Sequence, residues 1–394
     1  MTGNFKLLFC AALFSGAISA QPPQTTGSPV APFDQPGESA GENTGAAPVA
    51  FVYMSRPTHI DGFAAAANGK LTPVPGSPFA NIAVTHMSVN KSYLFGVGTG
   101  ADVYTFSIAA NGSLKLVATT NVFKNERNCA EGPGRSSIDY TGSTLDIPLS
   151  CSNGYHLQSY RIEPNGDLQY LGSSLSQLGA VPPIFLGTNK YAYVVEFGCG
   201  PANNALSATY SRESNELLTV SGTDAVPMPP DPASGVFYCP SFVMAGDPTN
   251  HLALVVQTSS SGEGLDGPPV IATYTADAHG NLTTRSTQAN MIFTQQESDI
   301  EGLSISPSGK FIAVGGTGFQ VFHFNGGEPV SDGSSLIEPD ELWGDFAWDR
   351  SDHLYAITFD NGLFVYNVTA NGVEPAAGSP YLIPEAGSVI VLSK

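Results

Sequence analysis

The sequence has few charges, and most of them are negative. Only 12% of the residues are Asp, Glu, Lys or Arg, and 34 acidic residues outnumber 15 basic ones, which gives a net charge of −19. A surface this acidic repels nucleic acid and anionic lipid and disfavours phosphorylated substrates. We therefore expect neither nucleic acid nor membrane insertion, and we expect a monomer.

Several catalytic motifs are also missing. There is no Gly-x-Ser-x-Gly nucleophile elbow, no His-Glu-x-x-His zinc motif and no Gly-Lys-Ser/Thr phosphate loop. The chain has no Cys-x-x-Cys pair, which disfavours a zinc site built from four thiolates. The sequence therefore does not belong to the common serine hydrolase, metalloprotease or P-loop classes.

One long apolar run is present, and it lies at the N-terminus. It extends over Leu7–Ala20 after a single charge, Lys6, and it falls short of the roughly 20 residues that a membrane-spanning helix needs. Residues 1–20 therefore predict a signal peptide and a secreted or periplasmic protein. Residues 21–47 are rich in Pro, Gly, Ser and Thr and predict a disordered leader, which leaves 48–394 as one domain.

A turn motif recurs through this domain. The seven turns are Asn68-Gly69, Asn111-Gly112, Asn165-Gly166, Asn215-Glu216, Gly280-Asn281, Asn325-Gly326 and Asn371-Gly372. Asn-Gly between alternating apolar and polar residues is a strong hairpin signal, because both residues tolerate positive φ. The spacing, about 45 residues, suits units of four short strands.

The repeat predicts an all-β fold, a seven-bladed β-propeller with four antiparallel strands per blade. The strands expected in three of the units are Val84–Val89, Tyr93–Val97, Val103–Ile108 and Ser113–Ala118; Ile300–Ser306, Phe311–Val314 and Phe319–Phe324; and Trp343–Asp349, Leu354–Thr358 and Leu363–Val368. The first unit lacks an inner strand, while Ser388–Leu392 is a spare strand at the C-terminus. We expect this strand to complete the first blade and close the ring.

Three phrases in the repeat resemble a known family. They are 106–114 (FSIAANGSL), 71–79 (LTPVPGSPF) and 303–311 (LSISPSGKF). They are similar to those of the lactonase-type seven-bladed propellers, which include 6-phosphogluconolactonase-like proteins. The resemblance covers 48–394 and implies hydrolysis of a lactone. An exported acidic protein suits a neutral or weakly charged lactone, such as a sugar lactone, better than a phosphorylated one.

Aligning the inner strands on the turns that follow them places His86, Arg135, Asp345 and Gly302 in one column. We expect the first three side chains to point into the central channel at similar depth and to be catalytic. A His or carboxylate activates water, and an Arg holds a developing oxyanion. The family resemblance supports His86, because lactonase-type propellers often carry a His at this place.

Three carboxylates on the same face are candidate binding residues: Glu196, Asp299 and Glu301. Because no contiguous calcium loop is visible, we expect no metal and no cofactor, with calcium as the alternative that these oxygens allow. Two functions stay open. The chain is either a lactonase acting on a small lactone or carbohydrate, or a non-catalytic module that binds a glycan, peptide or protein.

Four cysteines follow the signal peptide, and an even number in an exported chain favours disulfides. Cys129 precedes an inner strand and Cys151 ends the next strand, so both lie on one face. Cys199 and Cys239 occupy similar places further along the chain. The sequence predicts the pairs Cys129–Cys151 and Cys199–Cys239, with Cys151–Cys199 and Cys129–Cys239 as the rival pairing.

Overall fold

The computed structural model describes residues 47–79, 81–126, 129–131, 134–176, 178–187, 190–196, 206–223, 226–230, 237–259, 267–295, 300–358 and 362–394. They fall within a single unit, residues 39–394. They form 28 β-strands and one 3-10 helix, η1 (Val122–Lys124), and contain no α-helix, which confirms the all-β prediction. The expected signal peptide, the leader up to residue 46, Asp299 and Cys199 lie outside the described residues. No helix in the described ranges has the length and apolarity to cross a membrane.

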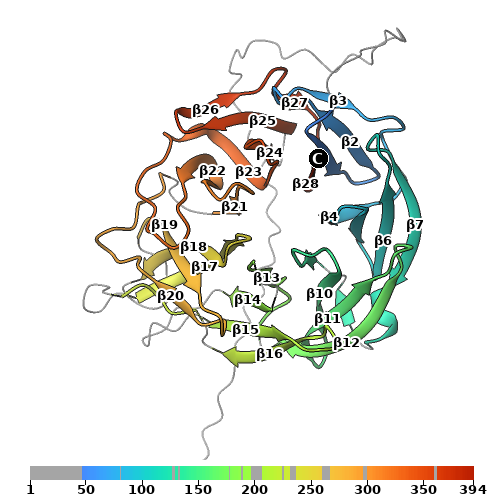
Figure 1. The fold of residues 1–394 in the computed structure, drawn as a ribbon, viewed down its shortest axis with the longest axis horizontal. Helices are drawn as coiled ribbons and strands as arrows, with labels where there is room; N and C mark the ends of the chain where they lie inside the picture. Colours follow the sequence, from blue (N-terminus) through green and yellow to red (C-terminus); the bar gives the residue numbers. More distant parts are fainter. Residues whose placement is uncertain are drawn as a thin grey trace, which may run out of the picture. The chain divides into compact units, whose positions relative to one another are not determined.

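The first and last strands of the chain share one sheet. Its order from the centre outward is β28 (Val389–Ser393), β1 (Ala50–Ser55), β2 (Ile60–Ala65) and β3 (Leu71–Pro73). β28 pairs antiparallel with β1, with Ala50 opposite Ser393 and Met54 opposite Val389. Figure 1 shows β28 on the inner side of β2 and β3. The C-terminal strand therefore completes the first blade, as its spare position in the sequence predicted.

Four further sheets are antiparallel, with the inner strand first in the chain. Their strands are β4 (Val84–Val89), β5 (Tyr93–Gly98), β6 (Asp102–Ile108) and β7 (Leu114–Asn121); β8 (Cys129–Glu131), β9 (Ser137–Ile138), β10 (Thr144–Cys151), β11 (Gly154–Ile162) and β12 (Leu168–Ser176); β13 (Ile184–Phe185), β14 (Tyr191–Glu196), β15 (Leu206–Arg212) and β16 (Leu218–Thr223); and β17 (Phe237–Gly246), β18 (His251–Ser259), β19 (Val270–Ala276) and β20 (Leu282–Thr284). In the second of these sheets, β8 and β9 both pair with β10.

The remaining strands form one continuous sheet. They are β21 (Gly302–Ile305), β22 (Phe311–His323), β23 (Ile337–Trp348), β24 (His353–Thr358), β25 (Gly362–Thr369), β26 (Gly372–Pro375) and β27 (Tyr381–Leu382). The described strands thus make five separate blades of four or five strands and one seven-stranded sheet. The prediction of seven separate four-stranded blades is wrong.

The fusion has its origin in β22. This strand runs through both segments that the sequence assigned to separate strands, Phe311–Val314 and Phe319–Phe324. The strand continues past Gly318, whose φ is +73°. β22 pairs with β23 on both sides of this glycine, with a shift in register between Thr317 and Phe319. β23 also pairs with β24, so the ladder passes from one repeat unit to the next without a break.

Neighbouring sheets pack face to face around a common centre (Figure 1). Phe51 of β1 packs with Leu94 and Phe106 of the next sheet, and Phe95 of that sheet packs with Ile147 of the following one. Burying each such side chain stabilises the fold by about 1.5–3 kcal/mol. This side-by-side packing turns the inner edge of every sheet toward a central channel.

The recurring turns also join one sheet to the next. The hydroxyl of Tyr53 in β1 donates a hydrogen bond to the carbonyl of Gly112, at 2.8 Å, in the turn of the neighbouring sheet. Tyr193 makes the equivalent bond to Gly280, also at 2.8 Å. Gly112 has φ +84°, and a Cβ there would lie 2.6 Å from the ring of Phe51. The turn motif therefore repeats because it serves both the hairpin and the contact between sheets.

Candidate functional site

The central channel contains two cavities that adjoin at two shared lining residues, a place called the junction below. The upper cavity, on the face where the inner strands begin, has a volume of about 780 Å³. The lower cavity, on the face where they end, has a volume of about 800 Å³. Asp345 and Phe346 line both cavities. Each volume is within the range of small-molecule sites, about 300–1,000 Å³.

Two of the predicted catalytic residues lie directly after irregularities in inner strands. The pairing of β4 with β5 shifts register between Val84 and His86. The pairing of β23 with β24 shifts between Trp343 and Asp345. Such β-bulges re-aim side chains and are common beside active sites. The bulges explain how two strands of ordinary sequence turn polar side chains toward the channel.

Arg135 reaches the channel because its inner strand is interrupted. It lies between β8 and β9, which both pair with β10. Arg135 is exposed and lines the upper cavity with Asp345, whereas His86 lines the lower one. The charge of Arg135 lowers the pKa of both His86 and Asp345. The three side chains thus gather around the junction of the cavities and do not share a single pocket.

Asp345 is a half-buried carboxylate held by two backbone donors. Its Oδ1 accepts a hydrogen bond from the amide of Phe346 at 3.0 Å, and its Oδ2 accepts one from the amide of Val389 in β28 at 3.1 Å. Burial raises the pKa of Asp345 to about 6, against the lowering effect of Val389 and Arg135. Asp345 is therefore ionised at neutral pH and is a stronger base than an exposed Asp.

His86 has the opposite shift. Burial, together with the smaller effect of the Arg135 charge, lowers its pKa to about 3. Its Nδ1 is buried and has no hydrogen-bond partner among the described residues. The ring is therefore neutral at physiological pH and is a weaker base than Asp345. It is suited to exchange a hydrogen bond with a ligand or with water in the lower cavity.

The predicted binding residues are separated in the structure. Glu301 lines the upper cavity together with Arg135 and Asp345. Glu196, at the end of β14, accepts a hydrogen bond from the amide of Gly179 at 3.2 Å and lines neither cavity. In the part of the chain that the structure describes, no three His, Cys, Asp or Glu side chains gather closely enough to hold a metal ion.

Phe346 is a wall residue that the sequence did not single out. A Cβ at Gly302 would lie 2.7 Å from its ring, and a Cβ at Gly315 would lie 2.3 Å from it. Gly302 thus has no side chain in the aligned column because Phe346 fills that space. Only its position next to Asp345 in the sequence indicated that Phe346 lies at the site. Its contacts with the two glycines depend on the fold.

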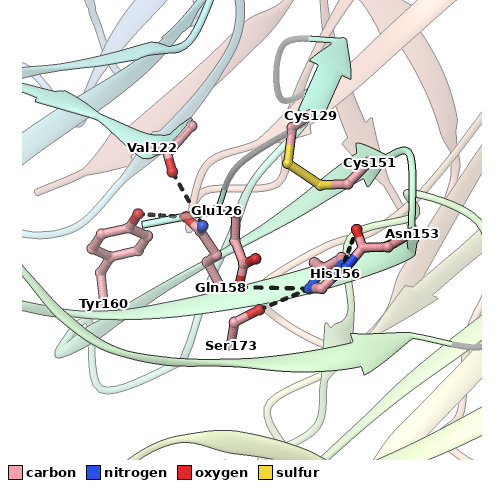
Figure 2. The surroundings of a disulfide bond; sticks show 9 residues. All are labelled: Val122, Glu126, Cys129, Cys151, Asn153, His156, Gln158, Tyr160 and Ser173. Carbon is pink, nitrogen blue, oxygen red and sulfur yellow. Dashed lines mark hydrogen bonds and ion pairs between the residues drawn. A yellow bond between two sulfur atoms is a disulfide. The ribbon is translucent and has the colours of Figure 1, made fainter. Parts of the chain in front are cut away.

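A disulfide anchors the segment that leads to Arg135. Cys129 of β8 is bonded to Cys151 of β10, the first of the two predicted pairs (Figure 2). Beside it, the imidazole of His156 is within hydrogen-bonding distance of Asn153 and Ser173, and Glu126 lies 3.6 Å from that ring. Cys129 is thus tied to β10, and Glu126 lies beside β11.

The second predicted pair is only partly visible. Cys239 is disulfide-bonded. Cys199, its predicted partner, lies outside the described residues, so this pairing stays a prediction.

The sequence matches no known family model and no curated protein. Solved structures do resemble the fold. A periplasmic gluconolactonase from Pseudomonas aeruginosa superposes with a TM-score of 0.61 at 12% identity, over 87% of this chain and 99% of that one. A protein of unknown function from Desulfotomaculum acetoxidans gives 0.57 at 14% identity, over 87% and 99%. Hydrazine synthase from Kuenenia stuttgartiensis gives 0.55 at 11%, over 84% and 99%. At these identities the likeness shows that the chain has a propeller fold of the kind found in a lactonase.

Proposed function

We propose that this protein is an exported hydrolase that opens a neutral or weakly charged lactone at the junction of the two cavities. The observation that carries the proposal is Asp345, a carboxylate with its pKa raised to about 6 that lines both cavities near Arg135. The likeness of the protein's fold to that of a periplasmic gluconolactonase adds support. The net charge of −19 favours an uncharged substrate over a phosphorylated one.

The chemistry needs one base and one cationic hydrogen-bond donor. The carboxylate of Asp345 takes a proton from water while the water oxygen bonds to the lactone carbonyl carbon. Arg135 donates hydrogen bonds to the oxygen that becomes negative. The bond between the carbonyl carbon and the ring oxygen then breaks, and the ring oxygen takes the proton back from Asp345. One water is consumed, a hydroxy acid forms, and Asp345 returns to its carboxylate form.

A panel of lactones tests the proposal. The purified mature protein should open γ- and δ-lactones faster than buffer does, and Arg135→Ala should lower kcat by about 10²–10³-fold. Acid release monitored with a pH indicator measures the rate, with added calcium or a chelator as parallel arms. The alternative of a module for a glycan, peptide or protein predicts binding without turnover. An inactive protein across the whole panel would contradict the hydrolase proposal.

The monomeric state stays a prediction.

A further inference from the structure

The upper cavity has a polar side and an apolar side. Arg135, Glu301 and Asp345 supply its charged groups. The strands between them around the ring, near β13 and β17, contribute Val181, Pro182, Ile184, Val243 and Met244. Figure 1 shows β13 and β17 in succession between β10 and β21, on one side of the centre. These five side chains, called the apolar wall below, line the same cavity as Arg135 and Asp345.

Local backbone structure holds this apolar wall toward the channel. β17 changes register between Pro240 and Met244, which releases Val243 from regular pairing with β18. On the neighbouring segment, the amide of Val181 donates to the carbonyl of Gly179 at 2.7 Å, which fixes a tight turn. Val181 and Val243 are both half-buried, so a ligand in the cavity can cover their remaining exposed surface.

Two polar side chains, Ser241 and Gln257, also lie on this side of the cavity, and each donates a hydrogen bond within the protein. The hydroxyl of Ser241 donates to the carbonyl of Val255 at 3.1 Å. The amide nitrogen of Gln257 donates to the carbonyl of Gly267 at 3.2 Å. A hydroxyl group pressed against Val181, Ile184 or Met244 meets no polar side-chain atom of those residues, and a buried hydroxyl without a partner is unfavourable. An alkyl or aromatic group meets no such penalty there.

We infer that the preferred substrate is a lactone with an apolar substituent, an alkyl chain or an aromatic group, and not a sugar lactone. The lactone ring lies at Arg135 and Asp345, and the substituent packs against the apolar wall. This inference rests on the proposed function and specifies its substrate class. Burial of each added methylene group raises kcat/KM by about fourfold until the wall is covered.

The test compares alkyl-substituted γ-lactones of increasing chain length with glucono-δ-lactone. For the unaltered protein, kcat/KM should rise with each methylene and exceed the value for the sugar lactone. Val181→Ser should flatten the rise, while Val181→Phe should shorten the longest chain that is accepted. Val117→Ser is a matched control, because Val117 is 41% exposed on the outer strand β7 and lines neither cavity. Thermal melting of each variant confirms folding.

Calorimetry with alkyl-substituted γ-lactams, which resist hydrolysis, separates the inference from the proposed function. Tighter binding with each methylene supports the apolar site even if no lactone is opened, an outcome that would remove only the hydrolase proposal. Faster opening of glucono-δ-lactone, with no dependence on alkyl chain length, would overturn the inference and leave the hydrolase proposal in place. The inference would also be overturned if kcat/KM did not change with alkyl chain length in either Val181→Ser or the unaltered protein.

Discussion

At the residue scale, burial shifts the pKa values of Asp345 and His86 in opposite directions. It raises the pKa of Asp345 to about 6 and lowers that of His86 to about 3, because in both cases the charged form loses solvation. The usual order of basicity is therefore reversed, and the carboxylate becomes a stronger base than the imidazole. In the proposed reaction the general base is therefore Asp345, and His86 is assigned the part of a neutral hydrogen-bonding group.

This order predicts the pH dependence of activity. Since the base must be deprotonated, kcat/KM should fall about tenfold per pH unit below about pH 6, and it should level off above that pH. Asp345→Asn should lower kcat by about 10²–10⁴-fold. Initial rates measured from pH 4.5 to 8 on a lactone that the protein opens provide the check.

Two variants act as controls for this profile. Glu301→Gln changes a carboxylate in the same cavity and should leave the acidic limb near pH 6. His86→Ala should lower the rate without moving the limb. A limb that persists in Asp345→Asn and disappears in His86→Ala would transfer the base role to His86.

At the element scale, the strands and turns were predictable and the irregularities were not. The strand expected at Val84–Val89 is β4 itself, because alternating side chains mark a half-buried strand. The bulges before His86 and Asp345 leave no pattern in the sequence, because they depend on pairing with the next strand. The fused sheet was missed for the same reason. The sequence predicted two strands, Phe311–Val314 and Phe319–Phe324, but the ladder continues through the residues between them.

The candidate site was predictable to the same degree. Aligning repeat units placed His86, Arg135 and Asp345 around one channel, where the structure also has them. It could not reveal that Glu196 is bound to Gly179, since that contact comes from a neighbouring loop. The sequence repeat therefore predicts which residues lie on the inner strands. It does not predict the contacts that loops make.

The disulfide ties β8, the strand that precedes Arg135, to β10, and its removal should affect stability and activity. Cys129 and Cys151 are 22 residues apart, so replacing both with Ala should lower the free energy of unfolding by about 3 kcal/mol on the chain-entropy model. Because β8 precedes Arg135, kcat should fall while the acidic limb of Asp345 stays near pH 6. Urea denaturation and initial rates measure the two effects.

Peptide mapping of the unreduced double variant supplies the control, because the disulfide of Cys239 should remain intact. A free energy of unfolding equal to that of the unaltered protein would show that the bond does not constrain the chain. Unchanged kcat would show that Arg135 is held by other contacts.

At the scale of the whole molecule, closure of the ring and the candidate site are physically joined. β28 pairs with β1 and lines the lower cavity, and the amide of Val389 donates to Asp345 at 3.1 Å. The strand that completes the first blade thus also sets the environment of the proposed base. Removal of residues 387–394 should therefore strongly lower the melting temperature, because β1 loses its inner partner and its buried face.

A single substitution separates closure from the site. Ser55 and Ser388 are paired by backbone hydrogen bonding, so the amide of the next residue, Val389, points away from β1 and toward Asp345. Val389→Pro removes this donor without removing a bond to β1. Since the donor lowers the pKa of Asp345, its loss should raise that pKa and move the acidic limb of kcat/KM to higher pH. Val391→Pro is the matched control, because it makes the same change two residues along β28. An unmoved limb in Val389→Pro, or an equal movement in both variants, would mean that closure does not tune the proposed base.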